Sequence, residues 1–231
     1  MLWRERGDEY SVARALHLLA SANAMLDLYE EGIQQAKEAL EVFERLGRTT
    51  EQVACLIALA QVLWDNGQLD EAEEAITRAI NLLNNGPEFS LCQAHRILGN
   101  IYRVRGDTEK AIHHYNIAIG IASKFNWTDQ LFWIQYNLTV VYCNEHDFDN
   151  ATTHIQQAKE HALGDEYQLG RAMELQAQIW YKQKRFEDGV SEASCAIKIY
   201  EKLGAALDLN DCRDLLQNIE RARKGSPTSG G

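Results

Sequence analysis

The chain has 231 residues, 45% of them hydrophobic, and a formal net charge of −11. This length is sufficient for a sizeable core. The negative charge argues against general binding to nucleic acid or to an anionic membrane surface. Only two prolines are present, which favours a chain made of helices.

Targeting signals are not evident in the sequence. No run of 18 apolar residues is present, so we expect no membrane-spanning helix. The opening residues, MLWRERGDEYS, lack the apolar region of a secretory signal. The five cysteines are scattered without a CxxC pair, which is typical of reduced thiols. We therefore expect an intracellular, cytoplasmic protein.

Taken in chain order, the sequence predicts pairs of amphipathic helices separated by short turns. Residues 1–8 resemble the link that follows a second helix, as in VFERLGRTTEQ, and so form the end of a possible upstream repeat. Either Met1 caps a short array, or the chain was cut from a longer one. Five helix pairs follow within 9–203, at about 10–46, 50–84, 90–124, 129–163 and 167–203. Residues 204–224 predict a single amphipathic helix that caps the last pair, and 225–231 (GSPTSGG) a disordered tail.

Small residues recur at a fixed place late in the second helix of each pair. They are Ala39, Ala79, Ala118, Ala158 and Ala196, with steps of 40, 39, 40 and 38 residues. A second small residue lies seven positions earlier in every pair, and a third recurs in the first helix, as Ala20, Ala60, Gly99, Thr139 and Ala177. The turn position reads Asp27, Gly67, Gly106, His146 and Lys184. Small residues at registered positions let the two helices of a pair approach closely.

This pattern resembles the tetratricopeptide repeat (TPR), a helix–turn–helix unit that is stable only when stacked on its neighbours. The resemblance covers about nine-tenths of the chain, with a period longer than the usual 34 residues. It implies an all-α, right-handed superhelical solenoid of five TPR-like helix pairs with a C-terminal capping helix.

Longer strings resemble one class of TPR proteins. EEGIQQAKEALEVFERLG, EKAIHHYNIAIGIASKFNW and LGRAMELQAQIWY are similar to the C-terminal TPR arrays of basidiomycete fungal signal-transducing NTPases, in which a NACHT or NB-ARC module precedes the repeats. The resemblance implies a sensor or interaction role for the array. The nucleotide switch of that family would reside in an upstream NTPase module, which this sequence does not contain.

Motifs of catalysis and cofactor binding are missing from the sequence. It has no GxxxxGK[ST], GxGxxG or HExxH. The adjacent His113 and His114 point to different sides of a helix, so we expect them on the solvent surface rather than on a metal ion. Cys143 is the one cysteine near the expected groove, and a nucleophile there would need a partner histidine on a neighbouring element. We expect no enzyme activity, no catalytic residue, no cofactor and no metal.

The first helices of a stacked array line its inner groove. Counting from the small residue of each first helix gives the inward positions. The residues at these positions that we expect to bind a partner are Arg14, His17, Gln61, Trp64, Arg96, Asn100, Arg103, Trp133, Tyr136, Arg171, Glu174, Gln178 and Tyr181. Four arginines interleaved with aromatic side chains are typical of peptide-binding hot spots. The alternative interpretation is that these residues pack between repeats or form ordinary solvated surface.

Three functions follow from these patterns. The first is a non-catalytic protein-interaction module that binds a partner protein or peptide segment, acidic with an apolar anchor. The second is a regulatory or ligand-sensing region of a larger STAND-type NTPase. The third is a self-associating scaffold with Trp3 and Trp127 as contact residues. The carboxylate clamp of chaperone-binding TPR proteins is incomplete, because only Arg96 and Asn100 resemble it. For the first function, changing Arg96 and Arg103 to Glu is expected to abolish capture without unfolding the array.

Overall fold

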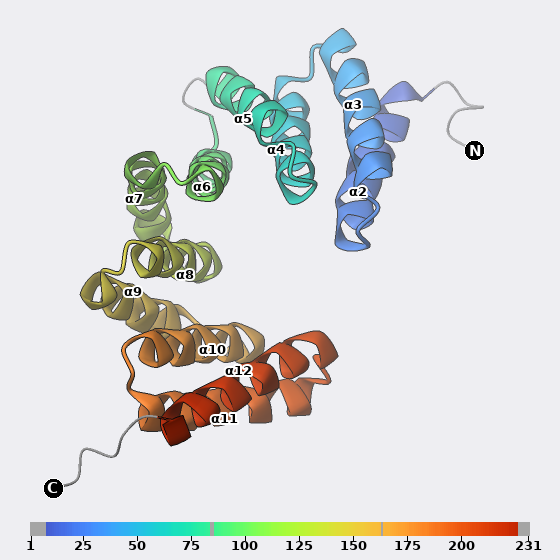
Figure 1. Ribbon diagram of the computed structural model, residues 1–231. Helices are drawn as coiled ribbons and strands as arrows, with labels where there is room; N and C mark the ends of the chain where they lie inside the picture. Colours follow the sequence, from blue (N-terminus) through green and yellow to red (C-terminus); the bar gives the residue numbers. More distant parts are fainter. Residues whose placement is uncertain (1–7, 84–85, 163, 226–231) are drawn as a thin grey trace, which may run out of the picture. The chain divides into compact units, whose positions relative to one another are not determined.

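The structure is a computed structural model that describes residues 8–83, 86–162 and 164–225 (Figure 1). Every regular element in these ranges is an α-helix, so the predicted all-α repeat solenoid is confirmed for the described residues. None of their helices is both long and apolar enough to cross a membrane. The predicted end of an upstream repeat falls on residues outside these ranges except for Asp8, and so does most of the predicted tail.

The chain forms two compact units that divide after Phe125. The first unit contains α2 (Glu9–Met25), α3 (Tyr29–Arg45), α4 (Thr49–Asp65), α5 (Leu69–Leu83), α6 (Glu88–Arg105) and α7 (Thr108–Phe125). The second contains α8 (Thr128–Asn144), α9 (Phe148–His161), α10 (Glu166–Lys182), α11 (Phe186–Leu203) and α12 (Ala206–Gly225). Within each unit, consecutive helices pack against one another.

The registered small residues form the centre of the helix pairs. All five alanines of the second-helix row, from Ala39 to Ala196, are fully buried. Where Gly32 faces Ala20, an added Cβ would lie 3.0 Å from the Ala20 carbonyl oxygen, so the two backbones of this pair nearly touch. A larger side chain in these rows would separate the helices.

The turns inside the pairs share one backbone conformation. Asp27, Gly67, Gly106, His146 and Lys184 all have positive φ, between 58° and 77°. These are the five predicted turn positions. The left-handed conformation ends the first helix and lets the chain reverse into the second. Only two of the five are glycine, so the other three turns accept some backbone strain.

Helix α12 begins two residues later than expected and extends one residue further. Gly204 takes a left-handed conformation that ends α11, so the new helix begins at Ala206. Ile219 and Cys212 of α12 are buried against α11, and the Cys212 thiol donates to the Ala193 carbonyl at 3.5 Å. Residues such as Asn210, Arg213 and Gln217 face solvent, which gives this end of the array a polar surface.

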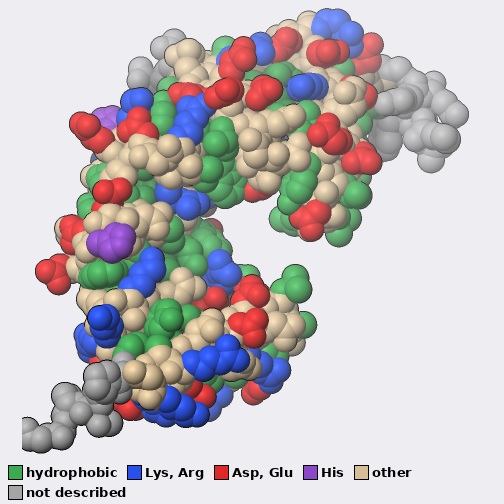
Figure 2. Space-filling model, in the orientation of Figure 1, with side chains coloured by type: hydrophobic (Ala, Val, Ile, Leu, Met, Phe, Trp, Pro, Cys, Tyr) green, Lys and Arg blue, Asp and Glu red, His purple; other side chains and the backbone are tan. Residues whose placement is uncertain are grey.

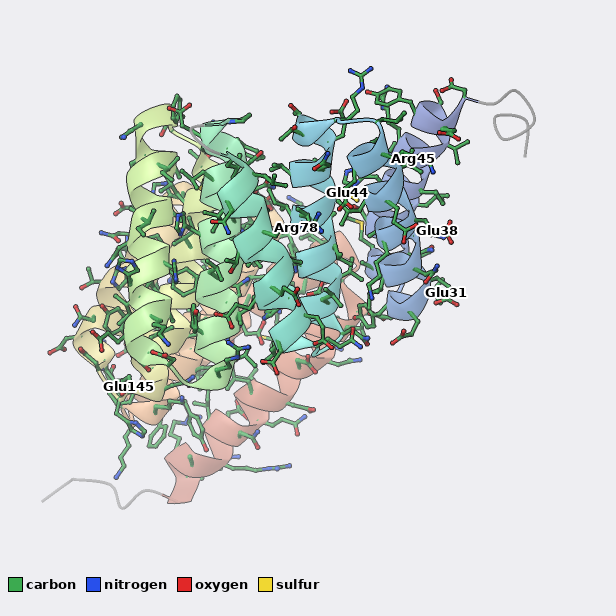
Figure 3. The ribbon with its side chains drawn as sticks, turned by 90° about the horizontal axis from the view of Figure 1, so that it is seen from above. Glu31, Glu38, Glu44, Arg45, Arg78 and Glu145 are labelled. Carbon is green, nitrogen blue, oxygen red and sulfur yellow. The ribbon has the colours of Figure 1, made fainter. Side chains whose placement is uncertain are left out.

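Ion pairs connect successive second helices in the first unit. Arg78 on α5 lies 2.5 Å from Glu44 on α3, and the two side chains can be followed in Figure 3. A second ion pair lies within the first helix pair, where Arg45 of α3 is 2.9 Å from Glu9 of α2. Both pairs are solvent-exposed, so each contributes little to stability.

Candidate functional site

The inner face of the first unit contains a cavity of about 440 Å³ between α2, α4 and α6. It is lined by His17, Ser21, Ala24, Met25, Ala54, Ile57, Ala58, Gln61, Val62, Asp65, Ser90, Gln93, Arg96 and Ile97. All three lining helices are the first helices of consecutive pairs. Three of the predicted groove residues, His17, Gln61 and Arg96, therefore line one cavity.

The floor of the cavity is apolar because α4 presents small and aliphatic residues there. Ala54, Ile57 and Ala58 follow one another at spacings of three and one, and Ile97 of α6 adds a further aliphatic side chain. Ala54 is exposed, whereas Ile57 is nearly buried. The alanines leave open the space that larger side chains would fill, so an apolar group of a ligand would fit over Ile57.

Polar groups surround this floor. The Gln61 amide donates to both oxygens of Asp65, at 3.1 and 3.2 Å. Burial raises the pKa of Asp65, and the Gln61 hydrogen bond and the charge of Arg96 oppose that rise. The Nδ1 atom of His17 is buried without a hydrogen-bond partner among the described residues. Burial also lowers the pKa of His17, so its ring is neutral at neutral pH. The wall of the cavity thus combines the cation of Arg96, the carboxylate of Asp65 and a His17 ring nitrogen that has no hydrogen-bond partner among the described residues.

Asn100 and Arg103, both predicted to line the groove, are used inside the first unit instead. Asn100 is buried and accepts a 2.8 Å hydrogen bond from the Tyr115 hydroxyl of α7. Arg103 also hydrogen-bonds Tyr115, and burial raises the pKa of this tyrosine to about 12. Changing Arg103 to Glu would place a second acceptor beside the buried hydroxyl. The expected Arg96 and Arg103 double variant is therefore a poor test of binding. The remaining residues of this unit, exposed Arg14 and half-buried Trp64, do not line the cavity.

In the second unit, Arg171 is already paired within the chain. Its guanidinium lies 3.0 Å from Asp208 of α12 and 3.3 Å from the Tyr136 hydroxyl, and it stacks over the Tyr136 ring. The Trp133 ring packs edge-on against Tyr136, with ring centroids 5.9 Å apart. An acidic partner would have to displace Asp208 to reach this arginine.

Glu174, Gln178 and Tyr181 complete the predicted groove residues of the second unit. Glu174 is buried and accepts a 2.9 Å hydrogen bond from the Tyr200 hydroxyl of α11, so the expectation that it faces the groove needs correction. Gln178 is half-buried, and the ring of half-buried Tyr181 packs near Phe186. Of the two proposed self-association contacts, Trp127 is half-buried and Trp3 lies outside the described residues.

Changing Tyr200 to Phe should lower the free energy of unfolding by about 1–3 kcal/mol near neutral pH. Burial raises the pKa of Glu174 above its ordinary value of 4.5, and the Tyr200 hydrogen bond opposes that rise. Without the hydroxyl, the pKa rises further, and the buried carboxylate loses a donor. The destabilisation should therefore shrink as the pH falls and Glu174 becomes protonated. Urea denaturation at neutral and acidic pH measures this difference; an equal loss at both values would contradict it.

Sequence reasoning missed a histidine pair in the first unit. The Nδ1 atoms of His95 on α6 and His114 on α7 are 3.0 Å apart, and the His114 ring stacks on Tyr102. His113 is exposed as expected, but His114 is half-buried. The second unit has the same arrangement with glutamine in place of one histidine: Gln135 lies 2.6 Å from His154, which stacks on Tyr142. This recurrence at repeat spacing was the signal that could have found the pair.

Changing His95 to Gln should make the first unit less sensitive to acid. Burial lowers the pKa of both His95 and His114, the latter from 6.5 to about 4, and the nearby charges are Glu73 on α5, Lys110 and His113 on α7. A lowered folded-state pKa means that full stability is present above about pH 6.5 and is lost as the pH falls toward 4. Glutamine removes one of these groups while keeping an acceptor for His114.

Chemical denaturation of the wild type and His95→Gln at neutral pH and at about pH 5 measures this sensitivity. His113→Gln is the control, because that exposed ring should matter less. Identical acid sensitivity in the wild type and His95→Gln would contradict the prediction.

Four of the five cysteines, Cys55, Cys92, Cys143 and Cys212, are buried. Burial raises the pKa of Cys143, and it raises the pKa of Cys55 to about 12. An activated nucleophile needs the opposite shift. Within the described residues, no group of three or more His, Cys, Asp or Glu side chains is arranged to hold a metal ion.

Comparisons with known proteins support the repeat fold. The tetratricopeptide repeat family model matches residues 11–85, which include α3, α4, α5 and all of α2 except Glu9 and Tyr10. No curated protein sequence matches the chain significantly.

Three solved structures illustrate the similarity of fold. A Rap protein complexed with competence and sporulation factor is 16% identical, with a TM-score of 0.69 over 93% of this chain and 65% of its own. A thermophilic TPR protein from Thermus thermophilus is 17% identical, with a TM-score of 0.68 over 89% of this chain and 99% of its own. A STAND protein with a TPR sensor from Pyrococcus horikoshii is 16% identical, with a TM-score of 0.69 over 94% of this chain but only 36% of its own.

Proposed function

We propose that this chain is a non-catalytic protein-interaction module that holds a partner peptide in the cavity between α2, α4 and α6. The observation that carries the proposal is the cavity itself, which gathers an apolar floor and convergent polar groups on three successive first helices. Binding pockets for small ligands have this size and this mixture of groups. The tetratricopeptide match over residues 11–85 covers α2 and α4, two of the three helices.

The chemistry of the wall supports an acidic segment with an apolar anchor. An aliphatic or aromatic side chain would cover Ile57 and Ile97, and a carboxylate beside it would meet Arg96. The Rap structure shows a similar fold in complex with competence and sporulation factor, which supports the binding of a partner by this fold.

Selection from a random-peptide display library on the immobilised chain tests the proposal. The expected result is enrichment of peptides that carry Asp or Glu next to a large apolar residue, and loss of their binding when Arg96 is changed to Glu. Arg78→Glu, on the outer side of α5, is the control for charge alone. Failure to enrich any peptide would overturn the function, and enrichment without acidic residues would overturn only the partner chemistry.

A second candidate is a sensor region in a longer STAND-type NTPase, in the class that the fungal resemblance indicates. The similarity to the Pyrococcus horikoshii protein favours it, because this chain matches about a third of that protein. An immunoblot of the native polypeptide tests this candidate. A band several times larger than 26.2 kDa is expected for a sensor region, and a band at 26.2 kDa would contradict it.

The predicted organisation and location accompany these proposals. We propose five repeats at about 10–46, 50–84, 90–124, 129–163 and 167–203 with a C-terminal capping helix, and a cytoplasmic location for the protein. Limited proteolysis, which should cut between the helix pairs, tests the repeat boundaries. Cell fractionation tests the cytoplasmic location.

A further inference from the structure

The cavity between α2, α4 and α6 contains a carboxylate that the acidic partner segment would leave unused. Asp65 lines the cavity together with Arg96, and Asp65 is exposed enough for a partner to reach it. The Gln61 amide donates to both of its oxygens, at 3.1 and 3.2 Å. A carboxylate can accept about four hydrogen bonds, so about two further positions around Asp65 suit donors of a ligand. The cavity therefore presents one negative and one positive group to whatever binds there.

Local physical chemistry disfavours a charged carboxylate at position 65. Asp65 is the last residue of α4, where the carbonyl groups of the helix end disfavour a negative charge. Burial raises the pKa of Asp65, and the nearby charge of Asp27 raises it further. The Gln61 hydrogen bond and the charge of Arg96 oppose this rise without cancelling it. Conflicts with local stability are concentrated at functional sites, so Asp65 is better explained by a ligand than by the fold.

The equivalent positions of the other first helices carry no acid. Five residues after the small residue of each first helix, the chain has Met25, Asp65, Val104, Asn144 and Lys182. Helix α4 alone has a carboxylate at this position, and α10 has the cation that a helix end favours. The repeat fold therefore accepts apolar, neutral and basic residues there. The negative charge is specific to the helix in the middle of the cavity.

Within the described part of the chain, Asp65 forms no ion pair. Asp27, in the α2–α3 turn, accepts a 2.6 Å hydrogen bond from the Tyr29 hydroxyl and likewise has no ion pair there. Figure 2 shows acidic side chains beside hydrophobic ones at the end of the α2–α3 pair, where this turn lies. A cation supplied by a partner would stabilise the charged form of Asp65 against both burial and the charge of Asp27.

The two charges of the cavity are anchored at different levels along the helices. Arg96 occupies the position on α6 that Ile57 occupies on α4, 39 residues earlier. Asp65 lies eight residues beyond Ile57, which is about 12 Å along the axis of α4. An extended peptide spans this distance with about four residues. The acidic and basic side chains of a partner should therefore be about three to five residues apart.

We propose that Asp65 binds a cation of the partner peptide, so that the cavity selects a segment with an acidic side chain, an apolar anchor and a Lys or Arg. The inference rests on the proposed function and adds the second charge of the partner. Opposite charges at a fixed spacing also determine the direction in which the peptide lies. A segment with acidic side chains alone would be attracted by Arg96 and repelled by Asp65, which is how a binding site rejects the wrong partner.

Peptides selected on the immobilised full chain give the first test. The enriched sequences should carry Lys or Arg about three to five residues from their acidic residue, always on the same side of it. Enriched peptides with an acidic and an apolar residue but no recurrent cation would overturn this inference and leave the proposed function standing. Failure to enrich any peptide would overturn both.

A double-mutant cycle on one enriched peptide tests the contact itself. Replacing the lysine or arginine of the peptide by glutamine should weaken its binding to the wild type about tenfold or more, as the loss of a charge-assisted hydrogen bond does. Asp65→Asn should weaken the original peptide by a similar factor, and the glutamine peptide should bind both proteins alike. Glu71→Gln removes the same charge from exposed α5, outside the cavity, and is the control. Equal binding of the original peptide by the wild type and Asp65→Asn would overturn the inference.

Urea denaturation of Asp65→Asn separates a binding role from a structural one. Asparagine keeps an oxygen for the Gln61 amide and removes the charge that the helix end disfavours. This variant should therefore unfold at the same urea concentration as the wild type or at a higher one. Unfolding at a clearly lower concentration would mean that Asp65 serves the fold, and would overturn its assignment to a ligand.

Discussion

Changing Ala54 to Trp should weaken the binding of a selected peptide at least about a hundredfold, a loss of about 2.7 kcal/mol in binding free energy. Ala54 lies on the floor of the cavity, and its side chain is exposed, so the indole would enter the space that the partner needs. The fold should tolerate the change because no helix covers this position. Fluorescence anisotropy of a labelled peptide measures the dissociation constants.

Ala206→Trp is the matched control for this variant. Ala206 is an exposed alanine at the start of α12, outside the first unit, so the same substitution there should leave the affinity unchanged. Equal affinity of the wild type and Ala54→Trp would show that the peptide binds elsewhere. Equal weakening by both variants would point to a nonspecific effect of the added tryptophan.

Changing Gly99 to Ala should destabilise the first unit by about 2 kcal/mol or more, as overpacking of a core does. A Cβ at this position would lie 2.5 Å from Cε1 of the Tyr115 ring and 2.6 Å from its Cδ1. Tyr115 is fully buried, and its hydroxyl is fixed by the hydrogen bond to Asn100, so the ring cannot withdraw without breaking that bond. The gain in helix propensity, about 1 kcal/mol, offsets only part of the clash.

Gly120→Ala provides the control for helix propensity. Gly120 lies in α7, and nothing is within 4 Å of the Cβ that alanine would add. This variant should therefore be as stable as the wild type or up to about 1 kcal/mol more stable. Urea denaturation compares the two. A Gly99→Ala variant with wild-type stability would contradict the close contact between α6 and Tyr115.

The architecture could be predicted because it depends on local sequence features that repeat. Small residues at the positions of Gly32 and Ala39 determine how closely two helices approach. Their positions in one helix pair predict the equivalent positions in the next pair. The turns followed in the same way, since each helix pair must reverse direction at the same point. His146 and Lys184 adopt the positive φ of Gly67 and Gly106 because the fold requires it there. Helix propensity alone would not predict a positive φ at His146 and Lys184.

The candidate site could be predicted only in part, because an inward position does not determine what a side chain binds. Counting along one helix assigns inward positions to Asn100 and Glu174, but both side chains are buried and accept hydrogen bonds from Tyr115 and Tyr200 of the second helices. Arg171 is paired with Asp208, which lies far away in the sequence on α12. Such pairings depend on side-chain length and on packing between helices, which a count along one helix does not contain.

Photocrosslinking tests the central claim most directly. A selected peptide with a benzophenone in place of its apolar anchor would be irradiated in complex with the full chain, and the linked residue identified by mass spectrometry. The account predicts crosslinks to residues of α2, α4 and α6 that line the cavity, with Ile57 and Ile97 among them. Crosslinks confined to α3 and α5, or to the second unit, would contradict it.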